Sequence, residues 1–150
     1  MFYIRDMKTN YKENVLSNRK VIFQRAFNLA KAPIIISIFV TPENVIFIIG
    51  LLWLALAFSV YWGIKLYNEN HRFLLLLLSL IIFSPISRIP VAILWWIDTR
   101  WEIGTHYSLY FDNFAQAFFQ QVVYGSLTQI IPGFLLGSLT LVIMKKFKSD

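Results

Sequence analysis

The sequence contains no cysteine, and only 15% of its 150 residues are charged. The absence of cysteine excludes disulfide bonds, thiolate metal sites and cysteine nucleophiles. The Walker loop and the GxSxG, GxGxxG, HExxH and CxxC motifs are also missing, as are internal repeats and low-complexity segments. We therefore expect no cofactor and no metal site.

Apolar residues are abundant and lie in long runs. They make up 57% of the chain, whereas an average soluble domain has about 45–50%. Because lipid offers no partner for an unpaired backbone group, such runs cross a membrane as helices. We expect an all-α integral membrane protein with one domain over residues 1–150. Its predicted parts are a basic arm with an interfacial helix (1–40), a transmembrane bundle (41–144) and a basic tail (145–150).

About three transmembrane helices are predicted, at residues 45–66, 73–97 and 114–144. The second is expected to be broken between Pro85 and Pro90, because each proline removes a backbone donor and clashes with the preceding turn. The third would be about 46 Å long as one helix, which exceeds the roughly 30 Å of a hydrocarbon core.

The first forty residues are more polar than the rest. Residues 1–14 show no periodicity and are predicted to be a flexible arm. Residues 15–31 have an apolar half and a basic polar half on a helical wheel, which is typical of a helix at the membrane interface. The alternative is a helix that packs on a partner or on this chain's own spans. Residues 32–40 are apolar but cover only roughly 14 Å.

The net charge of +6 comes mostly from the first 31 residues. Basic ends beside apolar spans indicate membrane orientation and contact with anionic lipid headgroups, and we expect no nucleic acid as a partner. Three crossings would put eight Lys and Arg on the N-terminal side and five on the other. This predicts a bacterial inner (plasma) membrane with a cytoplasmic N-terminus. The basic tail on the opposite side conflicts with the rule, and an even number of crossings would remove the conflict.

Arg88 lies between the two prolines of the second span, about 24 Å past Arg72 if the chain stays helical. An arginine at that depth costs a few kcal/mol unless it is paired or reaches the interface. One interpretation is an anchor that extends to the headgroups. The other is a binding site for an anionic headgroup or substrate.

A charged, aromatic connection follows the second span. It contains Asp98, Arg100, Glu102 and His106. His106 and Asp98 are candidates for proton transfer, and Arg100 and His106 are candidates for binding a lipid phosphate together with Arg88. The alternative is a solvated loop with internal ion pairs, and a metal site is disfavoured because no ligand spacing is present.

Small and polar residues recur every four positions in the third span. They are Gly125, Gln129, Gly133 and Gly137. Such a stripe lets helix backbones approach closely, and a glutamine can hydrogen-bond across the contact. The sequence leaves open whether the partner is another helix of this chain, another subunit or a second copy.

Three functional hypotheses follow. The first is a small non-enzymatic membrane subunit that packs into a larger membrane complex and stabilises or regulates it. The second is a membrane-embedded enzyme that handles lipid or acyl groups through Arg88 and the charged connection. The third is a small transporter or channel built as an oligomer around the broken span.

Overall fold

The chain is helical throughout the part that the structure describes. A computed structural model describes residues 2–40, 50–103 and 111–147, with the backbone alone for 2–17 and for residue 40. The predicted all-α class is confirmed over these residues. The elements are α1 (Phe2–Val40), α3 (Leu51–Leu66), α4 (Arg72–Trp101), α5 (Phe114–Phe119), the π-helical segment η2 (Gln120–Tyr124) and α6 (Gly125–Phe147).

Three helices are long and apolar enough to cross a membrane. They cover Asn18–Phe39, Arg72–Trp101 and Phe114–Phe147. This agrees with the predicted number and with an integral membrane location, but the set differs from the predicted one. The first predicted span, 45–66, corresponds to the shorter helix α3, which begins at Leu51, and residues 45–49 lie outside the described residues.

The N-terminal prediction needs correction. The expected arm (1–14), interfacial helix (15–31) and short apolar segment (32–40) join into the single helix α1. Pro33 lies inside it and does not end it, because a proline removes only one hydrogen bond and packing on neighbouring helices supports the rest. The segment 18–39 is therefore long enough to cross a membrane, which residues 32–40 alone are not. It packs alongside α4 and α3.

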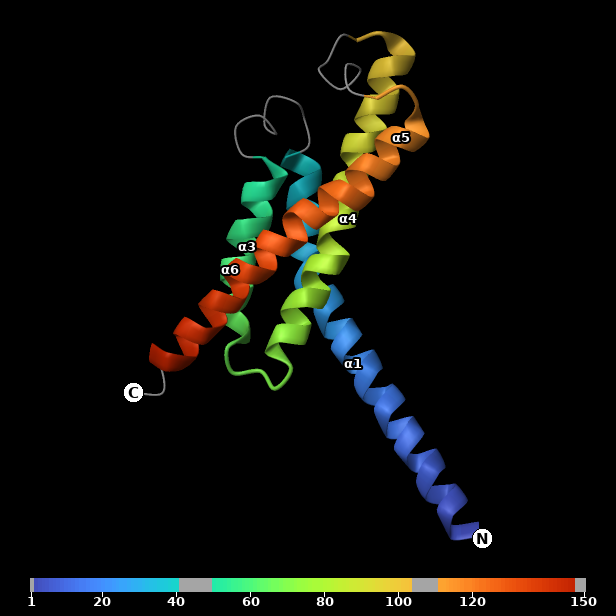
Figure 1. Cartoon of the computed structure of the whole chain (residues 1–150), viewed down its shortest axis with the longest axis vertical. Coiled ribbons are helices and arrows are strands. Elements are labelled where there is room, and N and C mark those ends of the chain that lie inside the picture. Colours follow the sequence, from blue (N-terminus) through green and yellow to red (C-terminus); the bar gives the residue numbers. More distant parts are fainter. Residues whose placement is uncertain (1, 41–49, 104–110, 148–150) are drawn as a thin grey trace.

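The helices form three layers. α3 and α4 are antiparallel neighbours joined by the short turn at residues 67–71. In Figure 1, α6 crosses in front of this hairpin and α1 lies behind it. α1 and α6 each contact α3 and α4 but, within the described residues, not each other. The N-terminus, the 67–71 turn and the C-terminus all lie at the lower end of the view in Figure 1.

Small side chains allow α1 to approach α4. Ala26, Ala30, Pro33 and Ser37 repeat every three or four residues, and all four are buried. The hydroxyl of Ser79 on α4 donates to the backbone oxygen of Ala26 at 3.5 Å. Ala26 and Ala30 of the predicted apolar half thus face this chain's own bundle, which was the alternative to an interfacial helix, whereas Phe23 and Phe27 of that half are exposed.

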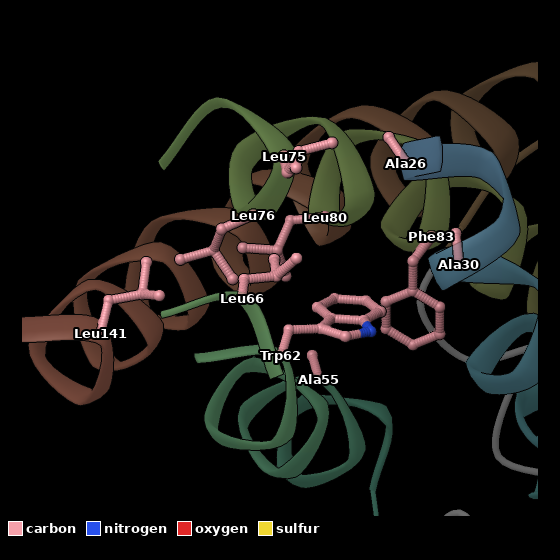
Figure 2. Close-up of a cluster of buried hydrophobic side chains, with 10 residues drawn as sticks. All are labelled: Ala26, Ala30, Ala55, Trp62, Leu66, Leu75, Leu76, Leu80, Phe83 and Leu141. Atoms are coloured by element: carbon pink, nitrogen blue, oxygen red, sulfur yellow. The ribbon is translucent and has the colours of Figure 1, made fainter. Parts of the chain in front are cut away.

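Larger side chains fill the centre of the bundle. Trp62 of α3 meets Phe83 of α4 edge to face, with the ring centroids 6.3 Å apart. Figure 2 shows these rings together with Leu76 and Leu80 of α4. Side chains from α1, α3, α4 and α6 all belong to this one cluster, so the four helices share a single core.

α4 is one continuous helix, and the predicted break between Pro85 and Pro90 is therefore wrong as an interruption of the helix. Each proline costs one hydrogen bond but leaves the other backbone pairs in place. The hydroxyl of Ser87 donates to the backbone oxygen of Ser84 at 2.8 Å, which supplies a donor within the proline-containing turns. The transporter hypothesis loses the broken span on which it depended.

Glycines set the contact between α6 and α3. A Cβ atom added at Gly63 would lie 2.7 Å from the Cβ of Thr140 and 2.9 Å from the backbone oxygen of Gly137. A Cβ at Gly133 would lie 2.8 Å from the Oγ of Ser59. At these positions the two helices approach backbone to backbone, as small residues permit in membrane proteins.

Replacing Gly63 should test this contact. Gly63→Val should lower the free energy of unfolding by about 1–3 kcal/mol, because the backbone at Gly137 cannot move aside without separating the helices. The matched control is Ala57→Val, at an exposed position of the same helix. Equal unfolding midpoints for both variants in detergent would contradict the close contact.

Candidate functional site

A column of polar side chains lies within the spanning bundle, where α4 meets η2 and α6. It consists of Ser84, Ser87, Arg88, Gln121 and Gln129, here called the Arg88 cluster. Ser84, Ser87 and Gln129 are buried, and Arg88 and Gln121 are partly buried. Polar groups inside a membrane bundle are rare and usually mark a functional or packing site.

Local structure brings Gln121 to this place. α5 begins at a capping box in which the side chain of Asn113 accepts from the backbone N–H of Gln116 at 2.8 Å. The side chain of Gln116 in turn accepts from the backbone N–H of Asp112 at 3.1 Å. The helix then widens into the π-helical segment η2, which carries Gln121 and contacts α4. π-helical turns of this kind are frequent at functional sites.

Arg88 contacts neutral groups only among the described side chains. Its Nη1 donates to the Oε1 of Gln121 at 3.2 Å. Its guanidinium lies against Gly125, where an added Cβ would be 3.2 Å from both Cζ and Nε. The Nε atom is buried and has no hydrogen-bond partner. The cluster therefore contains a cation whose charge no described carboxylate balances.

Gln129 continues the column toward the core. Its Oε1 lies 3.5 Å from the hydroxyl of Ser87, whose one proton is donated over the shorter distance of 2.8 Å to the backbone oxygen of Ser84. The Nε2 of Gln129 and the Oγ of Ser84 are buried without a partner. The stripe predicted from the sequence is thus divided: Gly125 and Gln129 lie beside the polar residues of α4, whereas Gly133 and Gly137 pack on Ser59, Leu76 and Leu80.

The charged connection does not converge into one site over the described residues. Asp98 is buried, with 2% of its surface exposed, whereas Arg100 and Glu102 are exposed. Glu102 caps the end of α4 in the left-handed conformation at φ 49°. Asp98 therefore lies inside the helix and Glu102 at its end, and the two carboxylates do not form a pair on one helical face. His106 lies outside the described residues. Its predicted roles in proton transfer and in binding a lipid phosphate therefore stay predictions.

Groups of three or more His, Cys, Asp or Glu side chains that could hold a metal ion do not occur in the described ranges. A separate charged contact lies at the opposite end of the bundle, where Arg25 of α1 pairs with Glu69 in the turn between α3 and α4. The Arg25 side chain is 55% exposed and that of Glu69 is 30% exposed, so water screens the pair and it contributes about 0–1 kcal/mol. A pocket of about 200 Å³ lies beside it.

A second cation within the apolar part of the chain is Lys31. It is exposed on the outer side of α1, and its Nζ lies 5.3 Å from the ring centroid of Phe27. The neighbouring outward residues Ile35 and Ile38 are apolar. Lys31 forms no ion pair with any side chain that the structure describes. The ion pair found among the described residues joins Arg25 and Glu69.

Sequence reasoning missed two of these features. Gln121 lies four residues before Gly125, so the small and polar stripe extends by one step to include it, but its contact with Arg88 is tertiary and does not follow from the spacing. The helical wheel puts Lys31 in the basic polar half of residues 15–31, which predicts a position at the membrane interface. The sequence treats 32–40 as a separate short segment, whereas the structure joins both into the helix α1.

Comparison with known proteins gives no assignment: no protein-family model, curated protein or solved structure matches this chain. The functional interpretation therefore depends on the two cations in apolar surroundings. Arg88 faces the inside of the bundle, and Lys31 faces outward from it.

Proposed function

We propose that the chain is a small non-enzymatic membrane subunit that packs into a larger membrane complex and stabilises or regulates it. The observation that supports this proposal is the outward position of Lys31. The outer side of α1 combines this cation with exposed Phe27, Ile35 and Ile38. A charged residue within a membrane-spanning helix normally pairs with an opposite charge in a protein neighbour.

Depth makes this position costly without a partner. Lys31 is 6 residues after Arg25, which pairs with Glu69 at the level of the 67–71 turn, and 8 residues before Phe39, where the apolar segment of α1 ends. These separations correspond to about 9 Å and about 12 Å along the helix. A lysine at the centre of a span costs about 2.5–3.5 kcal/mol on insertion scales. A carboxylate on a neighbouring helix would offset that cost more fully than partial extension toward water.

The partner that fits is a membrane helix of another protein with Asp or Glu near the middle of its span. A second copy of this chain fits less well, because the acidic residue that its candidate spans contain is Asp98, three residues before the end of α4. The glycine stripe of α6, whose partner the sequence leaves open, packs on α3 and α4 of the same chain. The docking surface in this proposal is therefore the outer side of α1.

The distribution of charge supports one orientation. Arg25, Lys65, Arg72, Lys145 and Lys146 belong to the end of the bundle that carries the 67–71 turn and both termini. Arg100 is the basic residue at the opposite end among the described positions. The positive-inside rule then places the basic end, and the N-terminus with it, in the cytoplasm. If the shorter apolar helix α3 also crossed, in addition to the three longer spans, the basic tail would lie on the same side as the start of α1 and its conflict with the rule would be removed.

Substituting Lys31 tests the subunit proposal. Wild type should co-purify with its partner in a stoichiometric ratio in mild detergent. Lys31→Met should reduce the amount of co-purified partner at least tenfold, because the intramembrane ion pair is lost. Lys31→Arg should retain the partner. Lys20→Met is the matched control, since it removes an exposed charge from the same helix nearer its polar end. A stable monomer from native membranes, or full retention in Lys31→Met, would contradict the proposal.

The orientation can be tested separately, because the chain has no native cysteine to interfere. Single variants Arg19→Cys and Lys146→Cys should react with a membrane-impermeant maleimide only after the cytoplasmic side is opened. Asp112→Cys should react in intact cells or sealed spheroplasts. Labelling of Arg19→Cys and Lys146→Cys from opposite sides would rule out four crossings.

A further inference from the structure

The donors of Arg88 exceed the acceptors that surround it. A guanidinium carries five N–H donors and cannot accept a hydrogen bond. Within the part of the chain that the structure describes, Arg88 donates to one side-chain acceptor, the Oε1 of Gln121, and its buried Nε has no hydrogen-bond partner. Lipid tails offer no acceptor, so the remaining donors require one from a ligand or from water.

The charge of Arg88 is also left without a local counterion. The nearest acidic residue along α4 is Asp98, ten residues further and therefore about 15 Å away along the helix axis. Glu69 lies in the turn at the other end of the bundle and pairs with Arg25. Within the described residues no acidic side chain forms an ion pair with Arg88, so its charge is available to a bound anion.

The surroundings of the guanidinium favour an oxyanion. Gln121 and Gln129 carry amide N–H groups, and Ser84 carries a hydroxyl without a partner. None of these groups repels an anion. Gly125 has no side chain, so the flat guanidinium can lie against the helix and keep its edge available. A planar fork of donors binds two oxygens of a phosphate at once.

The depth of Arg88 allows a headgroup to reach it. Trp95 and Trp96 lie seven and eight residues further along α4, and tryptophans gather at the level of lipid headgroups. Arg88 is about 12 Å below Trp96 along the axis. An arginine side chain extends several ångströms toward the interface, and that of Arg88 is only partly buried.

From this geometry we infer that the Arg88 cluster is a phosphate-binding site, open to the leaflet on the Arg100 side of the bundle. Its ligand is a phosphate oxyanion, carried by an anionic lipid headgroup or by free phosphate. Arg88 supplies the charge, and Gln121 holds one of its nitrogens so that the others face the ligand. This site is independent of the proposed subunit contact at Lys31, which lies on another helix.

The sharpest test places an internal counterion beside Arg88. Gln121→Glu keeps the size of the side chain and puts a carboxylate oxygen where the Oε1 of Gln121 now accepts from Arg88. It should lower the occupancy of bound anionic lipid at least tenfold without unfolding the protein. Gln120→Glu is the matched control, because it adds the same charge one residue earlier at an exposed position. It should leave the occupancy unchanged.

The readout is native mass spectrometry of purified protein after incubation with phosphatidylglycerol or phosphatidylcholine, with helical content checked by circular dichroism. Wild type should retain phosphatidylglycerol in preference to phosphatidylcholine, and Arg88→Gln should lose this preference. A second arm measures the melting temperature with inorganic phosphate. Phosphate protection that Arg88→Gln abolishes would identify free phosphate as the source, and lipid retention without such protection would identify the headgroup.

The proposal fails if folded Gln121→Glu and Gln120→Glu retain the same amount of phosphatidylglycerol as wild type and phosphate protects none of the proteins. It also fails if Arg88→Gln and Arg100→Gln reduce retention equally, since that result would mean general attraction of headgroups to positive charge. Loss of the partner in Lys31→Met with intact lipid retention would separate the two sites.

Discussion

Close approach of helix backbones is the constraint on which this structure depends. In lipid, apolar side chains gain little by leaving the solvent, so helices associate through packing and short contacts. The chain provides two such contacts, on opposite sides of the α3–α4 hairpin. Ala26 and Ala30 bring α1 to α4, and Gly63 and Gly137 bring α6 to α3. The rings of Trp62 and Phe83 then fill the space between them.

The same contacts decide which residues face outward. With the small residues turned inward, the bulky residues of α1 and α6 are left exposed, Ile35 and Leu135 among them. Apolar exposure of this kind is what a lipid environment stabilises. The polar residues divide accordingly: Gln129 is buried between helices and Arg88 is partly buried beside η2 and α6, whereas Lys31 is exposed on the surface. The two cations are therefore proposed to serve different ligands.

The sequence predicted those parts of the fold that depend on local pattern. The helical class, the start of the last helix at Phe114 and the small stripe of α6 follow from hydropathy, capping and spacing. The sequence did not predict that α1 and α4 are continuous helices. The rule that proline breaks a helix considers the lost hydrogen bond and the local clash, but not the packing on neighbouring helices that supports Pro33, Pro85 and Pro90. The meeting of Arg88 with Gln121 depends on tertiary contact across 33 residues, which no local rule reaches.

The π-helical segment η2 has a consequence for how the last helix is encoded. A π turn holds about one residue more than an α turn. Removing one residue from Gln120–Tyr124 should therefore convert the π turn into an α turn and leave α6 in nearly the same rotational phase relative to α5. The glycine face would keep its contact with α3, and the Asn113 cap would stay in place. The segment η2 is thus a place where the last helix can lose one residue without turning its glycine face away from the bundle.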